Sequence, residues 1–370
     1  MNFRKLIICA FIFSLFFTSC SSDETFKQTP YVPLGDYDSG VLVLHQGTGL
    51  SLPTTLSYIS FDLNTLENNI LSNVNPTLSP GIFGQDIGLI DGKAYIVQGG
   101  SNFIQIVNRY SMQSIATISE GLNNPRYIVF SNGKAYVSNQ AVFSDLTDDF
   151  ISVYNLATNT LVGSIPVSGG SAEKMVVNGT KLYLAQGGPY GTGNKIQVID
   201  LTNNTLGNFI TVADSPNSMQ IDNGILWVMC GGNSQYFPAA STQNAGALVK
   251  INIATQLIET SFGFSDSSLY PTNFTIFSSN AYYTIGSKVY KMALSAIALP
   301  TTPAFTSQAV SLNGFAVKSN HVYISDALFF DSAGKVYIYG AGTISGGPEL
   351  GVLEKEHSVG VAPSDFYFNQ

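Results

Sequence analysis

The residues with the clearest chemical potential occupy two adjacent positions that recur seven times along the chain. The first position carries Gln85, Arg126, Glu173, Asn217, Thr272, Asn313 and Ser364. The next carries Asp86, Tyr127, Lys174, Ser218, Asn273, Gly314 and Asp365. Such amides, hydroxyls, carboxylates and basic groups can donate and accept many hydrogen bonds. We call these two positions the starting positions, because they lie where the first strand of each repeat is expected to begin. Their residue types vary from copy to copy while the surrounding pattern repeats, which indicates contacts with a polar ligand.

Signals for catalysis are weak in comparison. His45, His321 and His357 are the only histidines. We expect His45 to pack inside a strand, His321 to lie at a hairpin turn away from the starting positions, and His357 to lie in a link before the last strand. The sequence contains no nucleophile elbow, phosphate loop or metal-spaced His/Cys cluster. It therefore predicts no enzyme and no cofactor, although Arg126, Glu173 and Lys174 leave a lactonase-type centre open as an alternative.

One acidic segment, "DLTDD" at 145–149, raises the question of a metal. Its carboxylates are the ligand type that Ca²⁺ prefers. Acidic loops are more often simply solvated, so the sequence predicts no metal site and leaves Ca²⁺ there open.

The elements that carry the starting positions form a repeat. An aromatic anchor recurs at Tyr95, Tyr136, Tyr183, Trp227, Tyr282 and Tyr323, and the same offset of twelve residues leads back to a strand-like segment each time. A short Asn-Gly, Asp-Gly or Ser-Asn turn lies between the two, which is a hairpin signature. Two further strand-like runs follow each hairpin. Four short strands repeated every 41 to 55 residues are typical of a propeller blade.

The seventh copy is divided between the chain ends. The last segment, "VAPSDFYFN", matches a first strand without a hairpin partner, and "GVLVLHQGTG" near the start opens three strands that lack a first strand. Joining the ends completes a blade and hides sheet edges. The sequence therefore predicts an all-β fold, a seven-bladed β-propeller with four-stranded blades over residues 39–370. In its last blade the segment 361–369 pairs with the strand around 41–44.

The N-terminal region differs from the propeller in composition. Arg4 and Lys5 precede an apolar run to Phe17 that is too short to span a bilayer, so residues 1–19 are predicted to be a signal peptide. Thr18-Ser19-Cys20 resembles a bacterial lipobox, which implies cleavage before Cys20 and lipidation of its thiol. Residues 20–38 would form the lipidated tether, and "SSDET" within it resembles an acidic export signal of Bacteroidota surface lipoproteins.

Charge and cysteine content narrow the possible partners. The formal net charge is −8 and no basic stripe is present, so nucleic acid is an unexpected partner. After loss of Cys9 and acylation of Cys20, Cys230 is the remaining thiol, which excludes an internal disulfide.

The strand order places the starting positions and the long loops at one end of the blades. Those loops are 47–55, 139–149, 186–193, 230–246 and 326–334, and long loops on a rigid scaffold commonly carry binding sites. The predicted ligand-binding residues are Gln85, Asp86, Arg126, Tyr127, Glu173, Lys174, Asn217, Asn273, Asn313, Asp365, Tyr190, Tyr236 and Phe237. The alternative for each is a structural role, with the polar groups binding backbone or water and the aromatic rings packing within their loops.

The repeats, together with "GVLVLHQGTG" and "LNNPRYIVFSNGKAYVSN", resemble the YncE-like propellers and their surface-lipoprotein branch in Bacteroidota. The resemblance implies a lipid-anchored protein exposed on the outer membrane, whose only membrane contact is the anchor. It also implies capture of a small ligand, with cobalamin or another corrinoid as first candidate, for a TonB-dependent outer-membrane receptor. A lactonase-type enzyme and a protein-interaction or adhesion platform remain the alternatives.

Overall fold

The computed structural model describes residues 32–234, 243–343 and 346–370, and within these ranges the strands form seven four-stranded sheets. Neighbouring strands in every sheet are antiparallel, as short hairpin connections require. The predicted seven-bladed, all-β propeller is thus confirmed. Residues Leu34–Gln370 form one compact unit, so Leu34 to Asp38 belong with the sheets. No helix in the described ranges is long and apolar enough to cross a membrane.

The first six blades follow one another along the chain, and in each blade the chain runs from the inner strand to the outer strand. Blade 1 contains β4 (Gly84–Ile90), β5 (Lys93–Gln98), β6 (Phe103–Asn108) and β7 (Ser114–Ile118). Blade 2 contains β8 (Pro125–Ser131), β9 (Lys134–Asn139), β10 (Phe150–Asn155) and β11 (Thr160–Pro166). Blade 3 contains β12 (Met175–Asn178), β13 (Lys181–Gln186), β14 (Lys195–Asp200) and β15 (Thr205–Thr211). Blade 4 contains β16 (Pro216–Asp222), β17 (Ile225–Gly232), β18 (Ala245–Asn252) and β19 (Leu257–Gly263).

The later blades show the same order. Blade 5 contains β20 (Pro271–Phe277), β21 (Asn280–Ile285), β22 (Lys288–Ala293) and β23 (Phe305–Thr306). Blade 6 contains β24 (Leu312–Lys318), β25 (His321–Asp326), β26 (Ala333–Gly340) and β27 (Leu353–Val361). Blade 7 combines β28 (Pro363–Asn369) with β1 (Gly40–His45), β2 (Thr55–Ser60) and β3 (Leu66–Glu67). One short helix, α1 (Ile70–Val74), follows β3.

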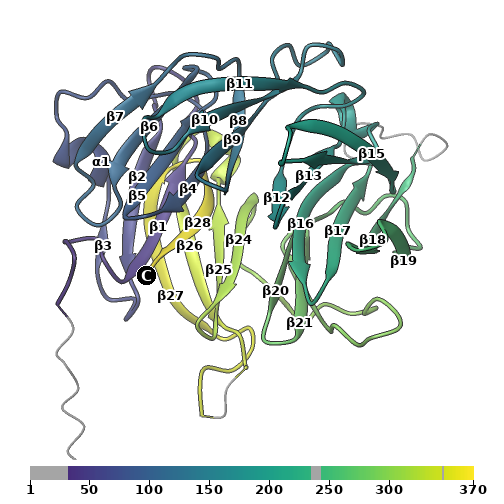
Figure 1. The fold of residues 1–370 in the computed structure, drawn as a ribbon. Coiled ribbons are helices and arrows are strands. Elements are labelled where there is room, and N and C mark those ends of the chain that lie inside the picture. Colours follow the sequence, from purple (N-terminus) through teal and green to yellow (C-terminus); the bar gives the residue numbers. More distant parts are fainter. Residues whose placement is uncertain (1–31, 235–242, 344–345) are drawn as a thin grey trace, which may run out of the picture. The chain divides into compact units, whose positions relative to one another are not determined.

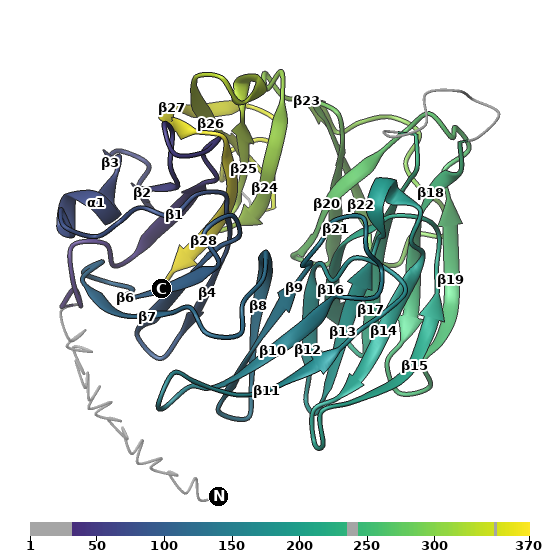
Figure 2. The same cartoon turned by 90° about the horizontal axis from the view of Figure 1, so that it is seen from above.

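The two ends of the chain meet in blade 7, as the split repeat predicted. Strand β28 pairs with β1 in antiparallel register, with Asn369 opposite Gly40 and Asp365 opposite Leu44. Figures 1 and 2 show the yellow strand β28 beside the purple strand β1. Inner strands of successive blades contact one another all the way round, including β28 with β24 and with β4. The ring is therefore closed by the last residues of the chain.

The hairpin turns between first and second strands adopt the left-handed conformation that their sequences indicate. Both turn residues have positive φ at Asp91-Gly92, Asn132-Gly133 and Asn223-Gly224, and also at the Ser278-Ser279 turn. Two consecutive positive φ angles are characteristic of type I′ turns, whose twist matches that of paired strands. These turns fix the end of each blade that lies opposite the starting positions.

In blades 1 and 2 the repeated aromatic anchor joins the blade to the next one. Tyr95 and Tyr136 are almost completely buried, at 1% and 0% exposure. The hydroxyl of Tyr95 lies 3.3 Å from the Asn159 side chain, and that of Tyr136 lies 3.3 Å from Asn204, each in the turn between third and fourth strands of the following blade. Burying a tyrosine removes about 150–250 Å² from water while the hydroxyl keeps a polar partner. In these two blades the tyrosine therefore stabilises the contact with the next blade. The hydroxyl of Tyr282, the anchor of blade 5, is instead buried without a hydrogen-bond partner among the described residues.

Two outer strands and one histidine differ from expectation. The outer strands β3 and β23 contain only two residues each, so blades 7 and 5 have little fourth strand. His357 lies within the outer strand β27, and the prediction that it belongs to a link before the closing strand is wrong. The strand extends to Val361 because it continues to pair with β26 as far as Ala333.

Candidate functional site

A polar pocket of about 680 Å³ lies where the inner strands begin, at the end of the ring opposite the hairpin turns. We call it the channel pocket. Its lining draws on all seven blades and comprises Gln46, Gly84, Gln85, Arg126, Tyr127, Lys174, Asn217, Ser218, Ser234, Ser268, Tyr270, Thr272, Asn273, Gly286, Leu312, Asn313, Ser364 and Asp365. Its volume is within the usual range for a small-molecule site, although its lining is more polar than most.

Irregular pairing at the start of the inner strands aims the side chains into this pocket. The register between first and second strands shifts between Gly84 and Asp86 in blade 1, and between Pro216 and Ser218 in blade 4. Blades 2, 5 and 6 shift at the same place. A bulge bends the strand, re-aims its side chains and leaves a backbone N–H without a ladder partner. The starting positions are therefore exposed to the channel by a repeated backbone device.

Some starting residues use their polar groups to join blades. The Asp86 carboxylate accepts a hydrogen bond from the backbone N–H of Ile128 at 2.9 Å, and the Ser218 hydroxyl accepts one from Phe274 at 3.0 Å. Each donor belongs to the inner strand of the next blade. These contacts satisfy backbone groups that the bulges leave unpaired, so Asp86 and Ser218 have a structural role.

The two asparagines at first positions show the same arrangement. Asn217 donates to the carbonyl of Pro271 at 2.9 Å, and Asn313 donates to that of Pro363 at 3.0 Å. Both prolines begin the inner strand of the following blade. The amide nitrogens of Asn217 and Asn313 therefore have the structural role of binding backbone. The same two residues also line the channel pocket.

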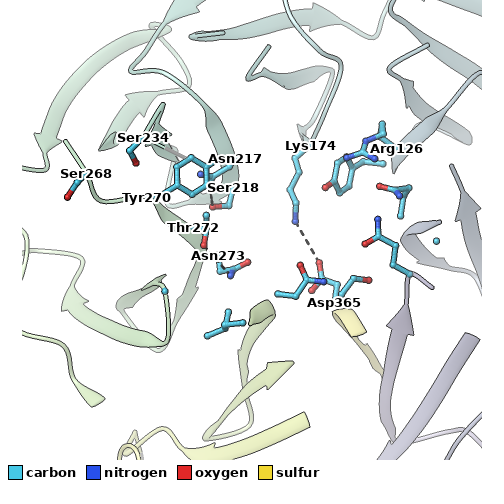
Figure 3. Close-up of a pocket in the computed structure, with 18 residues that line it drawn as sticks. Arg126, Lys174, Asn217, Ser218, Ser234, Ser268, Tyr270, Thr272, Asn273 and Asp365 are labelled. Carbon is cyan, nitrogen blue, oxygen red and sulfur yellow. Dashed lines mark hydrogen bonds and ion pairs between the residues drawn. The ribbon is translucent and has the colours of Figure 1, made fainter. Parts of the chain in front are cut away.

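Two ion pairs give one side of the channel pocket its charge. Arg126 Nε lies 3.2 Å from Glu173 Oε2, and Lys174 Nζ lies 3.7 Å from Asp365 Oδ2. Both cations contact the Tyr127 ring, with Lys174 Nζ 5.2 Å and Arg126 Cζ 6.0 Å from its centroid. Such contacts of cations with aromatic faces hold the basic groups in place. Figure 3 shows Lys174 and Asp365 pointing toward each other, with Arg126 to one side.

Burial and charge alter the proton affinities of this cluster. Burial raises the pKa of Asp86 to about 6, although the Ile128 N–H, the Lys174 ammonium and the Tyr367 hydroxyl all favour its ionised form. Burial by itself lowers the pKa of Lys174, but Tyr127, Asp365, Asp86 and Glu173 surround it, and the net effect is a raised pKa. Lys174 is therefore a cation at neutral pH, and its side chain keeps 36% exposure to solvent in the channel.

The opposite side of the channel pocket is neutral and rich in hydroxyl and amide groups. Tyr270 Oη lies 2.9 Å from the Ser215 hydroxyl, and Asn273 donates to Thr284 Oγ1 at 3.1 Å. Figure 3 shows Asn217, Tyr270, Thr272 and Asn273 on this side, with Ser268 farthest from Arg126. The pocket thus combines a charged side formed by blades 2, 3 and 7 with a neutral side formed by blades 4, 5 and 6.

Eight of the predicted ligand-binding residues line the channel pocket, namely Gln85, Arg126, Tyr127, Lys174, Asn217, Asn273, Asn313 and Asp365. Glu173 lies outside the lining and holds Arg126, and Asp86 also lies outside it, bound to Ile128 and Tyr367. Tyr190 packs edge-to-face on Phe143 in the neighbouring loop, with ring centroids 5.4 Å apart. Tyr236 and Phe237 lie outside the described residues.

Sequence reasoning missed Gln46, Ser234, Ser268 and Tyr270, which also line the pocket. Gln46 directly follows the second strand β1, and Ser234 is the second residue after the second strand β17. Ser268 and Tyr270 lie in the connection from blade 4 to blade 5. The predicted aromatic residues Tyr190, Tyr236 and Phe237 all come from sequence segments between second and third strands. Tyr270 could have been found from its place directly before Pro271, at the start of an inner strand.

Other reactive side chains lie away from the pocket or are engaged elsewhere. His45 is fully buried, its Nδ1 lies 2.8 Å from the Thr55 hydroxyl, and burial lowers its pKa to about 3. In the 145–149 loop, Asp145 accepts from Thr147 and Asp149 accepts from the Ala172 N–H. Among the residues with described positions, no group of three or more His, Cys, Asp or Glu side chains is placed to hold a metal ion.

Comparison with known proteins gives the fold and no closer relationship. No protein family and no curated protein matches the sequence. Among solved structures, the chain is similar to a quinonprotein alcohol dehydrogenase-like protein from Bacteroides thetaiotaomicron, with 14% identity, a TM-score of 0.65 and coverage of 90% of this chain and 79% of that one.

Two further propellers are more distant in structure. BamB from Moraxella catarrhalis is 11% identical, with a TM-score of 0.51 and coverage of 88% of this chain and 85% of its own. AztD from Citrobacter koseri, in its apo form, is 10% identical, with a TM-score of 0.51 and coverage of 88% and 96%. At such low identities these likenesses show the propeller fold alone.

Proposed function

We propose that this protein is a non-enzymatic binding protein that captures a small or medium-sized polar ligand in the channel pocket. One observation carries the proposal: side chains from all seven blades converge on a single polar cavity of about 680 Å³. Adhesion through blade edges or through loops would not require such a cavity. The carboxylates Glu173 and Asp365 are paired with cations and Asp86 is bound to its neighbours, which favours binding over acid–base catalysis.

The lining supports a ligand with many polar groups and little net charge. Arg126 and Lys174 are each paired with an acid, so the charged side offers ionic groups whose charges largely balance. Asn217, Thr272 and Asn273 on the neutral side can each donate and accept hydrogen bonds. A corrinoid, whose rim carries several carboxamide groups, fits this chemistry and is the first ligand to test because of the resemblance to YncE-like surface lipoproteins.

The cellular part of the proposal rests on that resemblance and on the N-terminal sequence. A lipid on Cys20 would anchor the protein at the outer membrane, and the bound ligand would pass to a TonB-dependent receptor. The channel pocket opens at one end of the ring, so a receptor covering that end would contact the ligand directly.

Calorimetric titration with cyanocobalamin and a panel of neutral polar compounds tests the proposal. Lys174→Gln and Tyr270→Phe should each weaken the binding of any ligand found, by about tenfold where a buried hydrogen bond is lost. Lys134→Ala, at a hairpin turn at the other end of blade 2, is the matched control and should bind normally. Equal binding by the wild type and both pocket variants would place the site elsewhere.

A further inference from the structure

A second cavity of about 450 Å³ lies beside the channel pocket, between blades 4 and 5. We call it the apolar groove. Its walls are mainly hydrophobic and include Phe262, Phe264, Leu269, Tyr290, Ile297 and Leu299. Ile297 is 94% exposed, although removing an isoleucine side chain from water lowers the free energy. The groove is therefore an accessible apolar surface.

A stack of aromatic rings supports the groove from below. The Tyr283 ring is buried and contacts Phe264 edge-to-face, with centroids 5.8 Å apart, and it stacks on Tyr290 at 5.1 Å. Phe264 and Tyr290 are in turn half-buried walls of the groove. Because these rings pack on the core cluster of blades 4 and 5, the groove has a fixed shape.

The short fourth strand of blade 5 accounts for the groove. Strand β23 pairs only with Lys288 and Val289 of β22, so the chain between β22 and β23 leaves the sheet. That segment carries Ile297 and Leu299 to the groove wall. A full-length outer strand, as in blade 4, would follow β22 closely instead.

The groove and the channel pocket share a wall. Leu269 lines the groove, whereas its chain neighbours Ser268 and Tyr270 line the pocket. Ile285 lines the groove, whereas the next residue, Gly286, lines the pocket. Figure 3 shows Ser268 at the end of the pocket farthest from Arg126, so the pocket extends toward this wall along its neutral side.

The wall between the channel pocket and the apolar groove contains an unusually short connection at Gly286. Strands β21 and β22 are joined by only Gly286 and Ser287, whereas the corresponding connection spans residues 140–149 in blade 2 and 187–194 in blade 3. Gly286 has a φ of +56°, which suits glycine in so tight a turn, and a Cβ built there would meet no atom within 4 Å. An extended molecule can therefore cross from the pocket to the groove over Gly286.

We propose that the ligand of this protein is amphipathic, with a hydroxyl- or amide-rich head in the channel pocket and an apolar tail over Gly286 in the apolar groove. This inference rests on the proposed binding function and specifies its ligand class. A wholly polar ligand would leave the groove uncovered, and a wholly apolar one would leave the charged side of the pocket desolvated without partners. One amphipathic molecule satisfies both cavities.

A homologous series of probes tests this inference. Methyl, hexyl and octyl β-glucoside share a hydroxyl-rich head and differ only in the tail, and each is titrated below its critical micelle concentration. Affinity should rise with chain length, by up to about fourfold for each methylene that enters the groove. Lys174→Gln should weaken all members that bind, because it alters the head site.

Groove variants locate the tail. Ile297→Asp changes an exposed side chain and should leave the fold intact while abolishing most of the chain-length dependence. Leu269→Asn, checked by circular dichroism, should act in the same direction. Ile115→Asp is the matched control, because Ile115 is 49% exposed on the outer strand of blade 1, outside both cavities, and it should retain the wild-type dependence.

Several results would overturn the inference and leave the proposed function intact. In the first such result, a corrinoid or another polar compound binds and Lys174→Gln weakens its binding. At the same time, no glucoside binds, or all three glucosides bind with equal affinity. Another is a chain-length dependence that both groove variants leave unchanged, which would put the tail elsewhere. Capture of a protein chain that Ile297→Asp abolishes, without any gain from alkyl tails, would assign the groove to protein docking. Failure of the proposed function itself would appear as binding insensitive to Lys174→Gln for every ligand.

Discussion

Lys174, directly before β12, and Asp365 on β28 form an ion pair across the central channel, with Nζ and Oδ2 3.7 Å apart. Blades 1 and 2 separate the two residues on the shorter way round the ring. The pair therefore connects blade 3 to blade 7 independently of the contacts between adjacent blades. It also places one positive and one negative group in the middle of the channel pocket (Figure 3).

We predict that Asp365→Asn changes the free energy of unfolding by less than about 1 kcal/mol. Both side chains of the pair are about one third exposed, at 36% and 33%, and solvent screens such a pair. Urea denaturation of the variant and the wild type measures the difference. A loss of several kcal/mol would mean that the pair is required for ring closure.

Asn369→Ala should lower the free energy of unfolding far more than Asp365→Asn does, although Asn369 lies next to the exposed Gln370. Asn369 is fully buried, donates to the carbonyls of Tyr37 and Arg109 at 2.7 Å each, and accepts from Arg109 Nε. Alanine leaves these groups buried without partners, at a cost of about 2–4 kcal/mol. Thermal and urea unfolding measure it, with Gln370→Ala at the exposed last residue as control. Equal stability of the two variants would show that β28 contributes little to closure.

Asp86 should make stability fall as the pH rises from about 4 to about 6. Its pKa is about 6 in the folded protein against an ordinary value of 3.8, so the folded state holds this proton more tightly than the unfolded state. Asp86→Asn should remove this contribution, on the order of 1–3 kcal/mol, so that the variant loses less stability between pH 4 and pH 7 than the wild type.

Urea unfolding across that pH range measures the difference between the two proteins. Asp91→Asn, at an exposed hairpin turn, is the control and should follow the wild-type profile. A profile for Asp86→Asn that parallels the wild type would show that Asp86 titrates alike in both states.

The Cys230 thiol should react with Ellman's reagent only when the protein unfolds. Cys230 is fully buried in β17, and burial raises the pKa of its thiol. The thiolate is the reactive form, so both access and ionisation are suppressed. A Cys9→Ala, Cys20→Ala variant isolates this thiol, and the same variant in urea gives the full reaction. Rapid labelling in native buffer would contradict the packing of β17.

Cys20→Ala should release the protein from the membrane fraction. Thr18-Ser19-Cys20 is the predicted lipidation site. In the described part of the chain, no helix is long and apolar enough to span a bilayer. Fractionation at high salt, with mass spectrometry of the N-terminal peptide, measures anchoring and the lipid. Asp23→Ala combined with Glu24→Ala should stay lipidated but become less accessible to external protease. A Cys20→Ala variant that remains in the membrane fraction would exclude the lipid anchor.

The fold could be predicted from the sequence because every blade needs the same local solutions. A buried aromatic anchor such as Tyr136 and a type I′ turn such as Asn132-Gly133 recur wherever a blade packs on the next one. The closing strand was recognisable because "VAPSDFYFN" has the pattern of an inner strand without its hairpin. The two-residue strand β23 was not, because an outer strand is fixed by packing on one side only.

The site could be predicted only in part. Residues that start inner strands, such as Arg126 and Asp365, reach the pocket because irregular strand pairing directs them there, and the repeat alignment identifies them. Which of them hold the next blade instead, as Asp86 holds Ile128, depends on distances between blades that no spacing along the chain encodes. Loop residues such as Ser268 depend on the path of the connection 264–270, which differs in length from the corresponding connections between the other blades.

The pairing of β28 with β1 also sets an order of events during synthesis. The strands β1, β2 and β3 of blade 7 are made before the other six blades, and their inner partner, Pro363–Asn369, is made after them. Until Pro363–Asn369 leaves the ribosome, the edge of β1 that faces the channel has no partner strand. Six blades can be present while the ring is still open, and a chain truncated by a few residues exposes an edge suited to pairing with another chain. Addition of β28 is therefore the step that turns a linear array of sheets into one cooperative unit.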